Sequence, residues 1–161
     1  MTKGCQPRNS IAIGLCCLIL ASSCGGPKVP EIQGKLPVFP VKGSLLVDGK
    51  PVAQAQLVFH PTAPWPKDAS QFLPRARTSD DGTFTVTTYA DADGAPAGTY
   101  RVTVTWRGEG DEEQQRTEDD PNLIPPVYHV PRLTKLRAQV EEGENTLPPF
   151  EVKITEQHAS S

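Results

Sequence analysis

Hydrophobic and polar residues alternate with a period of two along several short segments of the chain. The clearest segment is 99–106, TYRVTVTW, whose large apolar residues fall on one face: Tyr100, Val102, Val104 and Trp106. Successive side chains of a strand point to opposite faces, so this alternation predicts a strand with one buried face. The same reasoning predicts strands at 41–47, 55–60, 74–79 and 83–89, and two more within 136–154. Seven short strands separated by turns predict an all-β sandwich.

The pattern also predicts which side chains form the core and where the chain turns. From the six other strands the inward residues are expected to be Val41, Leu45, Val47, Leu57, Phe59, Phe84, Val86, Leu136, Ala138, Val140, Phe150, Val152 and Ile154. Asp48-Gly49 is a strong signal for a two-residue hairpin. Gly82 and Gly143 stand in two further predicted turns, and Gly98 is expected to precede the longest strand.

Proline argues against long helices. The chain has 17 prolines, 16 of them after residue 24, and each removes a backbone donor and disfavours a helix interior. The stretch EGDEEQQRTEDD (109–120) has helix-forming residues but no apolar face to bury. It is interpreted as a solvated acidic insertion.

The first 23 residues have the pattern of a secretory signal peptide. Lys3 and Arg8 precede the uncharged run IAIGLCCLILA (11–21), and small residues follow. Eleven apolar residues are too few to span a bilayer, which needs roughly 20. Cleavage after residue 23 would also remove three of the four cysteines and leave Cys24 as the first residue of the mature chain.

The segment LILASSCGG (18–26) resembles a bacterial lipobox, in which the cysteine after the cleavage site receives a diacylglyceryl thioether. It departs from the usual pattern at Ala21, where lipoboxes favour leucine, so plain secretion remains the alternative. A lipid on Cys24 would also remove the lone reactive thiol from an oxidising compartment. Gly25 is not the aspartate that retains some lipoproteins at the inner membrane, and the expected location is therefore the outer membrane of the cell envelope.

Residues 24–40 are predicted to be the lipidated cysteine and a spacer rich in proline and glycine, followed by the sandwich at 41–154 and a polar tail at 155–161. Four prolines and three glycines in 25–40 favour a semi-extended chain. Val38 and Phe39 could instead already open the sheet, and the two interpretations are compatible.

Charge excludes one class of partner. Removal of Lys3 and Arg8 from the 16 basic residues leaves 14 against 19 acidic ones, a net charge of about −5 for the mature chain. Nucleic-acid binding needs a concentrated positive face, and no basic cluster occurs in the sequence. The expected partners are the membrane, through the lipid on Cys24, and an envelope polymer or protein.

Four motifs together resemble a known family. VKGSLLVDGKPVAQAQLVFHP, TSDDGTFTV, PAGTYRVTVTW and VEEGEN are similar to the carboxypeptidase regulatory-like domain, also called transthyretin-like or prealbumin-like, as found in small bacterial lipoproteins. The resemblance covers about residues 41–154 and implies a seven-stranded Greek-key sandwich acting as a non-catalytic accessory module. A fold alone assigns no activity.

Candidate chemistry in the sequence is sparse. The three histidines, His60, His129 and His158, lack the spacing of a zinc-peptidase centre. Two Asp-rich turns, at 80–82 and 91–94, resemble calcium loops faintly, but lack the later ligands of such loops. Neither an enzyme activity nor a cofactor or metal is expected, and a metal-dependent enzyme is the least favoured alternative.

The loop HPTAPWPKDASQFLP (60–74) is the most suggestive surface. Trp65 and Phe72 lie among prolines, outside any alternating strand. Such aromatics can contact a carbohydrate or a peptide, or they can close an open end of the sandwich. The leading hypothesis is a lipid-anchored structural or binding module; the alternative is a carbohydrate- or peptide-binding module that uses this loop.

Overall fold

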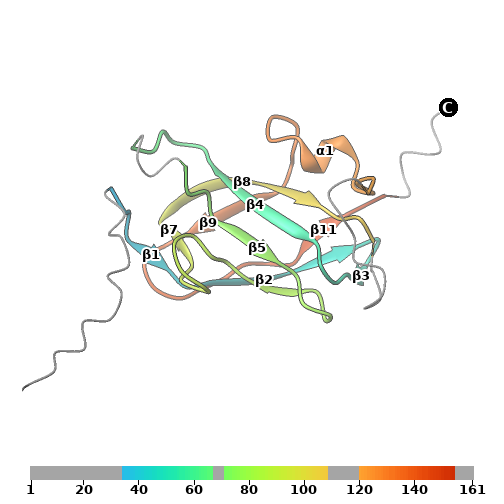
Figure 1. Ribbon diagram of the computed structural model, residues 1–161, viewed down its shortest axis with the longest axis horizontal. Helices are drawn as coiled ribbons and strands as arrows, with labels where there is room; N and C mark the ends of the chain where they lie inside the picture. The colour runs from blue at the N-terminus through green and yellow to red at the C-terminus, as the bar shows by residue number, and fades with distance from the viewer. Residues whose placement is uncertain (1–33, 67–70, 109–119, 155–161) are drawn as a thin grey trace, which may run out of the picture. The chain divides into compact units, whose positions relative to one another are not determined.

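Two layers of β-strands face each other across the hydrophobic core (Figure 1). The computed structural model describes residues 34–66, 71–108 and 120–154. These residues belong to one unit, Ile32–Ser161. Outside the described residues lie the predicted signal peptide, Cys24, most of the 24–40 spacer, nearly all of the acidic insertion and the whole polar tail at 155–161.

The first layer is a four-stranded antiparallel sheet. Its order is β5-β4-β8-β9, with the bounds Arg75–Arg77, Gln56–Pro61, Gly98–Thr105 and Arg137–Val140. The second layer is built around β2. Its strands are β2 (Val41–Val47), β3 (Lys50–Pro51), β6 (Thr83–Thr85), β10 (Asn145–Thr146) and β11 (Phe150–Val152). The strand β2 pairs in parallel with β10 and β11 and antiparallel with β3 and β6.

The expected all-β sandwich is confirmed. Each of the seven predicted segments contains one of the longer strands, namely β2, β4, β5, β6, β8, β9 and β11. Val38 and Phe39 form a strand, β1 (Val38–Phe39), as the second interpretation of 24–40 proposed, and it pairs with β7 (Ala95–Pro96). The short strands β3, β7 and β10 were not predicted separately. Because β1 lies within 24–40, the folded part begins a few residues before residue 41.

Most of the residues that the alternation placed inward are buried in the core, whereas Trp106 and Ile154 are only half-buried and pack against it. Leu45, Leu57, Phe59, Val102 and Val104 are completely buried, and Phe84, Val140, Phe150 and Val152 nearly so. The centroid of the Phe59 ring lies 6.0 to 6.5 Å from the ring centroids of Tyr100, Phe84 and Phe150. These aromatic contacts join the two layers, since Phe59 and Tyr100 come from one and Phe84 and Phe150 from the other.

Glycine at position 43 is required by this packing. Gly43 lies opposite Phe84 in the β2–β6 register, and a Cβ there would be 2.6 Å from Cζ of that ring. The predicted hairpin at Asp48-Gly49 is also present. Both residues have positive φ, 48° and 78°, as a type I′ turn requires.

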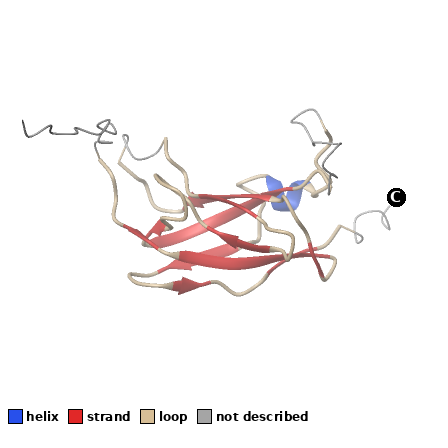
Figure 2. Ribbon diagram, turned by 60° about the horizontal axis from the view of Figure 1, so that its bottom comes forward, coloured by secondary structure: helices blue, strands red, loops and turns tan. Residues whose placement is uncertain are grey.

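One residue on the polar face of β8 is buried. Thr103 lies on the face opposite Val102, as the alternation predicts, yet it is only 6% exposed. The segment that contains α1 (Pro126–His129) packs against β8 on the outer face of the first layer (Figure 2). Thr134 donates a hydrogen bond to the Val102 carbonyl oxygen at 2.6 Å, and Arg101 donates to the Pro131 and Arg132 carbonyls. The four-residue helix itself was not predicted.

Candidate functional site

Trp65 packs against the core at the end of the sandwich that carries β1. Its indole meets the ring of Tyr100 edge to face, with centroids 6.1 Å apart. The Tyr100 hydroxyl donates to the Pro96 carbonyl oxygen at 2.5 Å, and Pro96 pairs with Val38 of β1. Burial, followed by the nearby Tyr89, raises the pKa of Tyr100, so this hydroxyl remains a donor.

Phe72 lies against a second tyrosine at the same end. The Phe72 and Tyr89 rings meet edge to face with centroids 5.7 Å apart. The Leu36 backbone N–H donates to the Tyr89 hydroxyl at 3.1 Å, and the Lys35 ammonium lies 5.1 Å from the ring centroid of Tyr89. The chain entering β1 is therefore fixed to the same tyrosine that Phe72 covers.

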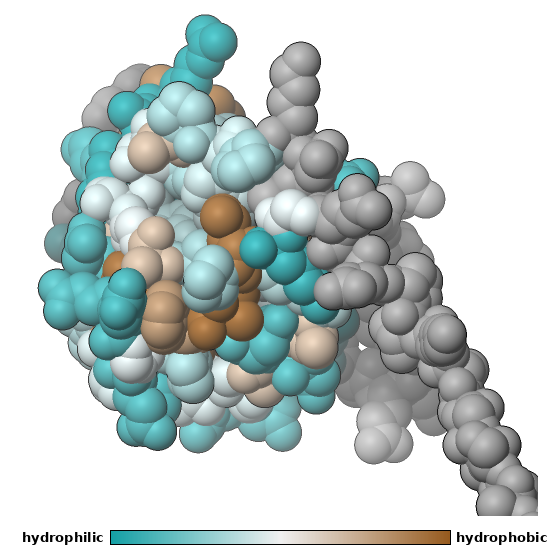
Figure 3. Space-filling view, turned by 90° about the vertical axis from the view of Figure 1, so that its left-hand side faces the viewer, coloured by the Kyte–Doolittle hydropathy of each residue, from teal (hydrophilic) through white to brown (hydrophobic). Residues whose placement is uncertain are grey.

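We call this surface the β1 end and define it by Lys35, Leu36, Phe39, Trp65, Phe72 and Tyr89. Apart from the exposed Lys35, all of these side chains are half-buried. Figure 3 looks onto the side of the unit where β1 and β7 lie, and it shows an apolar strip within a mainly hydrophilic surface. Trp65 and Phe72 thus close this end by packing on internal tyrosines, while part of each ring remains accessible.

Sequence reasoning found two members of the β1 end and missed the others. Trp65 and Phe72 were noticed because they interrupt a proline-rich loop. Tyr89 was assigned only to the end of a strand, and Lys35 and Leu36 to the spacer. The available signal was the apolar content of LPVF (36–39) immediately before the first long strand.

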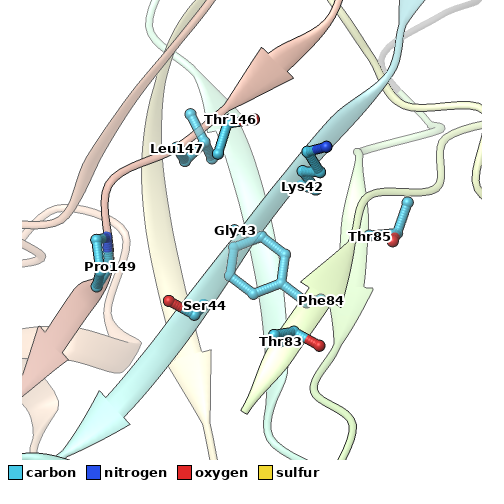
Figure 4. Close-up of a pocket in the computed structure, with 9 residues that line it drawn as sticks. All are labelled: Lys42, Gly43, Ser44, Thr83, Phe84, Thr85, Thr146, Leu147 and Pro149. Carbon is cyan, nitrogen blue, oxygen red and sulfur yellow. The ribbon is translucent and has the colours of Figure 1, made fainter. Parts of the chain in front are cut away.

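A second candidate site is a hollow of about 540 Å³ beside β2. It is lined by Lys42, Gly43, Ser44, Thr83, Phe84, Thr85, Thr146, Leu147 and Pro149. In Figure 4 the Phe84 ring lies across Gly43, with Lys42, Ser44 and the threonines around it. A smaller hollow of about 170 Å³ adjoins it and shares Lys42 and Thr85.

The polar side chains that line the larger hollow can form hydrogen bonds with a ligand. Four hydroxyl groups and one ammonium group line it, and none of its nine lining residues is a histidine or a carboxylate. The only basic side chain in this lining is that of Lys42. The arrangement can hold a polar ligand through hydrogen bonds.

The two Asp-rich turns use their carboxylates within the chain. Asp93 accepts hydrogen bonds from the backbone N–H groups of Thr88, Tyr89 and Ala90 at 2.7 to 3.0 Å. Asp81 accepts from the backbone N–H and the hydroxyl of Thr83, and these bonds lower the pKa of Asp81. The contact of Asp81 with a residue two positions later is that of an Asx turn, whereas Asp93 accepts from residues three to five positions earlier. In the described ranges no group of three or more His, Cys, Asp or Glu residues is placed to hold a metal ion.

The two described histidines form hydrogen bonds with different parts of the fold. His129 bonds through Nδ1 with the Ile124 carbonyl oxygen at 2.7 Å, next to α1. Nε2 of His60 and Oγ1 of Thr103 form a hydrogen bond at 3.0 Å, and Arg101 faces His60 across the β4–β8 pair. His158 lies outside the described residues.

The burial of His60 predicts a pH effect on stability. Burial lowers the pKa of His60 below its ordinary value of 6.5, so below that pH the unfolded state takes up a proton more readily than the folded state. The free energy of unfolding should fall as pH drops from about 6.5 toward the lower folded pKa. Between about pH 7.5 and 5.5, the melting temperature of the wild type should decrease more than that of His60→Gln. Equal decreases in the two proteins would show that His60 titrates normally.

Comparison with known proteins gives structural neighbours only. No family model and no curated protein matches the chain.

Among the described residues, no helix has both the length and the apolar character that a membrane crossing demands.

Solved structures that resemble the chain include two DUF3823 family proteins. A DUF3823 family protein from Parabacteroides merdae matches with a TM-score of 0.40 and 13% identity, covering 73% of this chain and 47% of that one. A DUF3823 family protein from Bacteroides ovatus matches with a TM-score of 0.35 and 14% identity, covering 71% of this chain and 44% of that one. The chain is thus similar to two DUF3823 family structures over less than half of their length.

Proposed function

We propose that this chain is a lipid-anchored protein of the bacterial cell envelope whose sandwich is a non-catalytic, transthyretin-like structural or binding module. The observation that carries the proposal is the segment LILASSCGG, which places Cys24 directly after a cleavable signal pattern. The Cys24 thiol would lose its proton and form a thioether with the diacylglyceryl group of a phospholipid, while the C–O bond to the phosphate breaks and the phosphorylated headgroup leaves. The outer membrane is the proposed location.

The described residues support the module part of the proposal. Asp81 and Asp93 accept hydrogen bonds within their own turns, and His60 and His129 each bond to a group of the fold. Each of these side chains therefore forms hydrogen bonds within the fold of the sandwich. The hollow beside β2 offers hydroxyls and one ammonium for a polar ligand.

A carbohydrate- or peptide-binding module that uses Trp65 and Phe72 remains the alternative. Both rings already pack edge to face on tyrosines of the same chain, which favours a role in closing the β1 end. A ligand at this loop would meet only the part of each ring that remains accessible.

Cys24→Ala should abolish membrane attachment in the bacterial cell. One acyl chain binds membranes only marginally, whereas two or three chains give stable anchoring, so the wild type should partition into detergent and carry lipid mass. The mutant should remain in the aqueous phase without added mass. Partitioning in a phase-separating detergent and mass spectrometry of the purified protein measure both.

Cys17→Ser is the matched control, because it removes a cysteine that the proposal assigns to the discarded signal peptide. This variant should partition like the wild type. A wild-type protein that is aqueous and free of lipid mass would reject the lipid anchor.

A further inference from the structure

We infer that the β1 end faces the bilayer and rests on its interface; this inference rests on the lipid anchor proposed above. The β1 end combines apolar side chains, Leu36, Phe39 and Phe72, with Trp65, Tyr89 and the ammonium of Lys35. Aromatic rings with a polar edge gather at membrane interfaces, and lysine can reach headgroup phosphates from an apolar stem. The composition of this end is therefore that of an interfacial surface.

The length of chain before β1 places this end within reach of the membrane. Twelve Cα–Cα steps join Cys24 to Leu36, about 40 Å at most if each step spans roughly 3.3 Å. The tether enters the fold at the β1 end itself, since the Leu36 N–H is bonded to Tyr89. A tether this short keeps the surface at an effective concentration on the order of millimolar, so even a weak interfacial affinity suffices.

Apolar exposure alone does not decide which end faces the membrane. Leu123 and Leu133 near α1 are 45% and 55% exposed, and Leu123 is bonded through its N–H to the Trp106 carbonyl oxygen. The two ends differ in the number of acidic residues: seven occur in 109–120, whereas Asp91 and Asp93 lie in the turn next to Tyr89 at the β1 end. The acidic stretch 109–120 joins the described chain at Gly108 and Asp120, and the Arg107 side chain bonds to the Asp120 carbonyl oxygen just after Trp106. An anionic bilayer surface repels such a concentration of acidic residues.

The two tryptophans provide reporters for the two ends. Trp65 packs on Tyr100 near the start of β8, and Trp106 follows the last residue of the same strand. Six residues of strand separate positions 100 and 106, about 20 Å at 3.3 to 3.4 Å per residue. Lipids with brominated acyl chains quench tryptophan only near the bilayer, so each reporter senses its own end.

The experiment uses the full lipidated chain bound to phosphatidylethanolamine–phosphatidylglycerol vesicles, with and without brominated acyl chains. Trp106→Phe leaves Trp65 as the sole tryptophan, and Trp65→Phe leaves Trp106. We expect bromine to reduce the emission of Trp65 and to leave the emission of Trp106 unchanged. Circular dichroism melts check that both variants fold.

A pair of charge substitutions tests whether the surface itself makes the contact. In the Trp106→Phe background, Leu36→Asp should reduce the quenching of Trp65, because it places a carboxylate at the interface. Leu123→Asp, the same kind of change near α1, should leave the quenching unchanged. Equal effects of the two substitutions would overturn the inference.

The remaining outcomes are also decisive. If the protein carries no lipid mass and does not bind vesicles, the proposed anchor itself fails. If the anchored protein shows no quenching of Trp65, or equal quenching of both tryptophans, the anchor stands and the inference fails. If the emission of Trp65 depends on the protein-to-lipid ratio and not on bromine, the β1 end instead contacts a second copy of the chain. A response to peptidoglycan fragments without quenching by bromine would assign it to carbohydrate or peptide binding.

Discussion

Val102→Asp is expected to unfold the domain. Val102 is completely buried on β8, and it faces Phe59 across the β4–β8 pair. A carboxylate there would have no partner, at a cost of several kcal/mol. Because a typical domain is stable by only about 5–15 kcal/mol, the expected result is loss of the cooperative melt measured by circular dichroism.

Arg101→Asp, one residue away, is the matched control. Arg101 points to the opposite face of the sheet and lies directly across from Arg137 of β9. The substitution loses two long hydrogen bonds to the Pro131 and Arg132 carbonyls, but it replaces a like-charged cross-strand pair with an opposite-charged one. A small change in melting temperature is expected. Equal damage from the two substitutions would contradict the assignment of faces on β8.

Gly94→Ala is expected to have the second-largest effect. Gly94 has φ of 95°, and an added Cβ would lie 1.8 Å from the carbonyl oxygen of Phe39. Since that atom belongs to β1, the clash can be relieved only by moving the backbone that pairs β1 with β7. Beyond the backbone strain of about 1–2 kcal/mol, the pairing of β1 should be lost. Denaturant unfolding and hydrogen exchange of Phe39 measure the two effects.

Gly143→Ala separates strain from the clash. Gly143 has φ of 107°, close to that of Gly94, but no heavy atom lies within 4 Å of its added Cβ. It should therefore show the strain alone and leave β1 protected from exchange. If Gly94→Ala and Gly143→Ala lowered the free energy of unfolding equally, the close approach of Phe39 to Gly94 would make no contribution to the effect of Gly94→Ala.

The strands were predictable because each has its own local signal. Along β8 and β9 the alternation of apolar and polar residues separates Val102 and Val140 from Arg101 and Gln139, and burial follows the same division. The hairpin at Asp48-Gly49 was equally local, since the residue types determine which turn can form. These features need no information about distant parts of the chain.

Other features depend on segments far apart in sequence and could not be predicted. The burial of Thr103 is decided by the segment around α1, more than 20 residues later in the chain. The pairing of β2 with β11 joins Leu45 to Phe150, and no local pattern encodes that choice of neighbour. For the β1 end, composition pointed to Trp65 and Phe72, but their partners Tyr100 and Tyr89 emerge only from the folded packing.

The parallel pairing of β2 with β11 has a mechanical consequence for a tethered protein. The chain enters β2 from the N-terminal side, and β11 leads away toward the C-terminus, so tension between the two ends pulls these neighbouring strands in opposite directions. The load falls in shear on the hydrogen bonds that align Leu45–Val47 with Phe150–Val152, and they must break together instead of one at a time. Resistance to such tension is governed by the rate of forced unfolding. If the N-terminus is anchored as proposed, a domain with this strand order transmits force while its core remains folded.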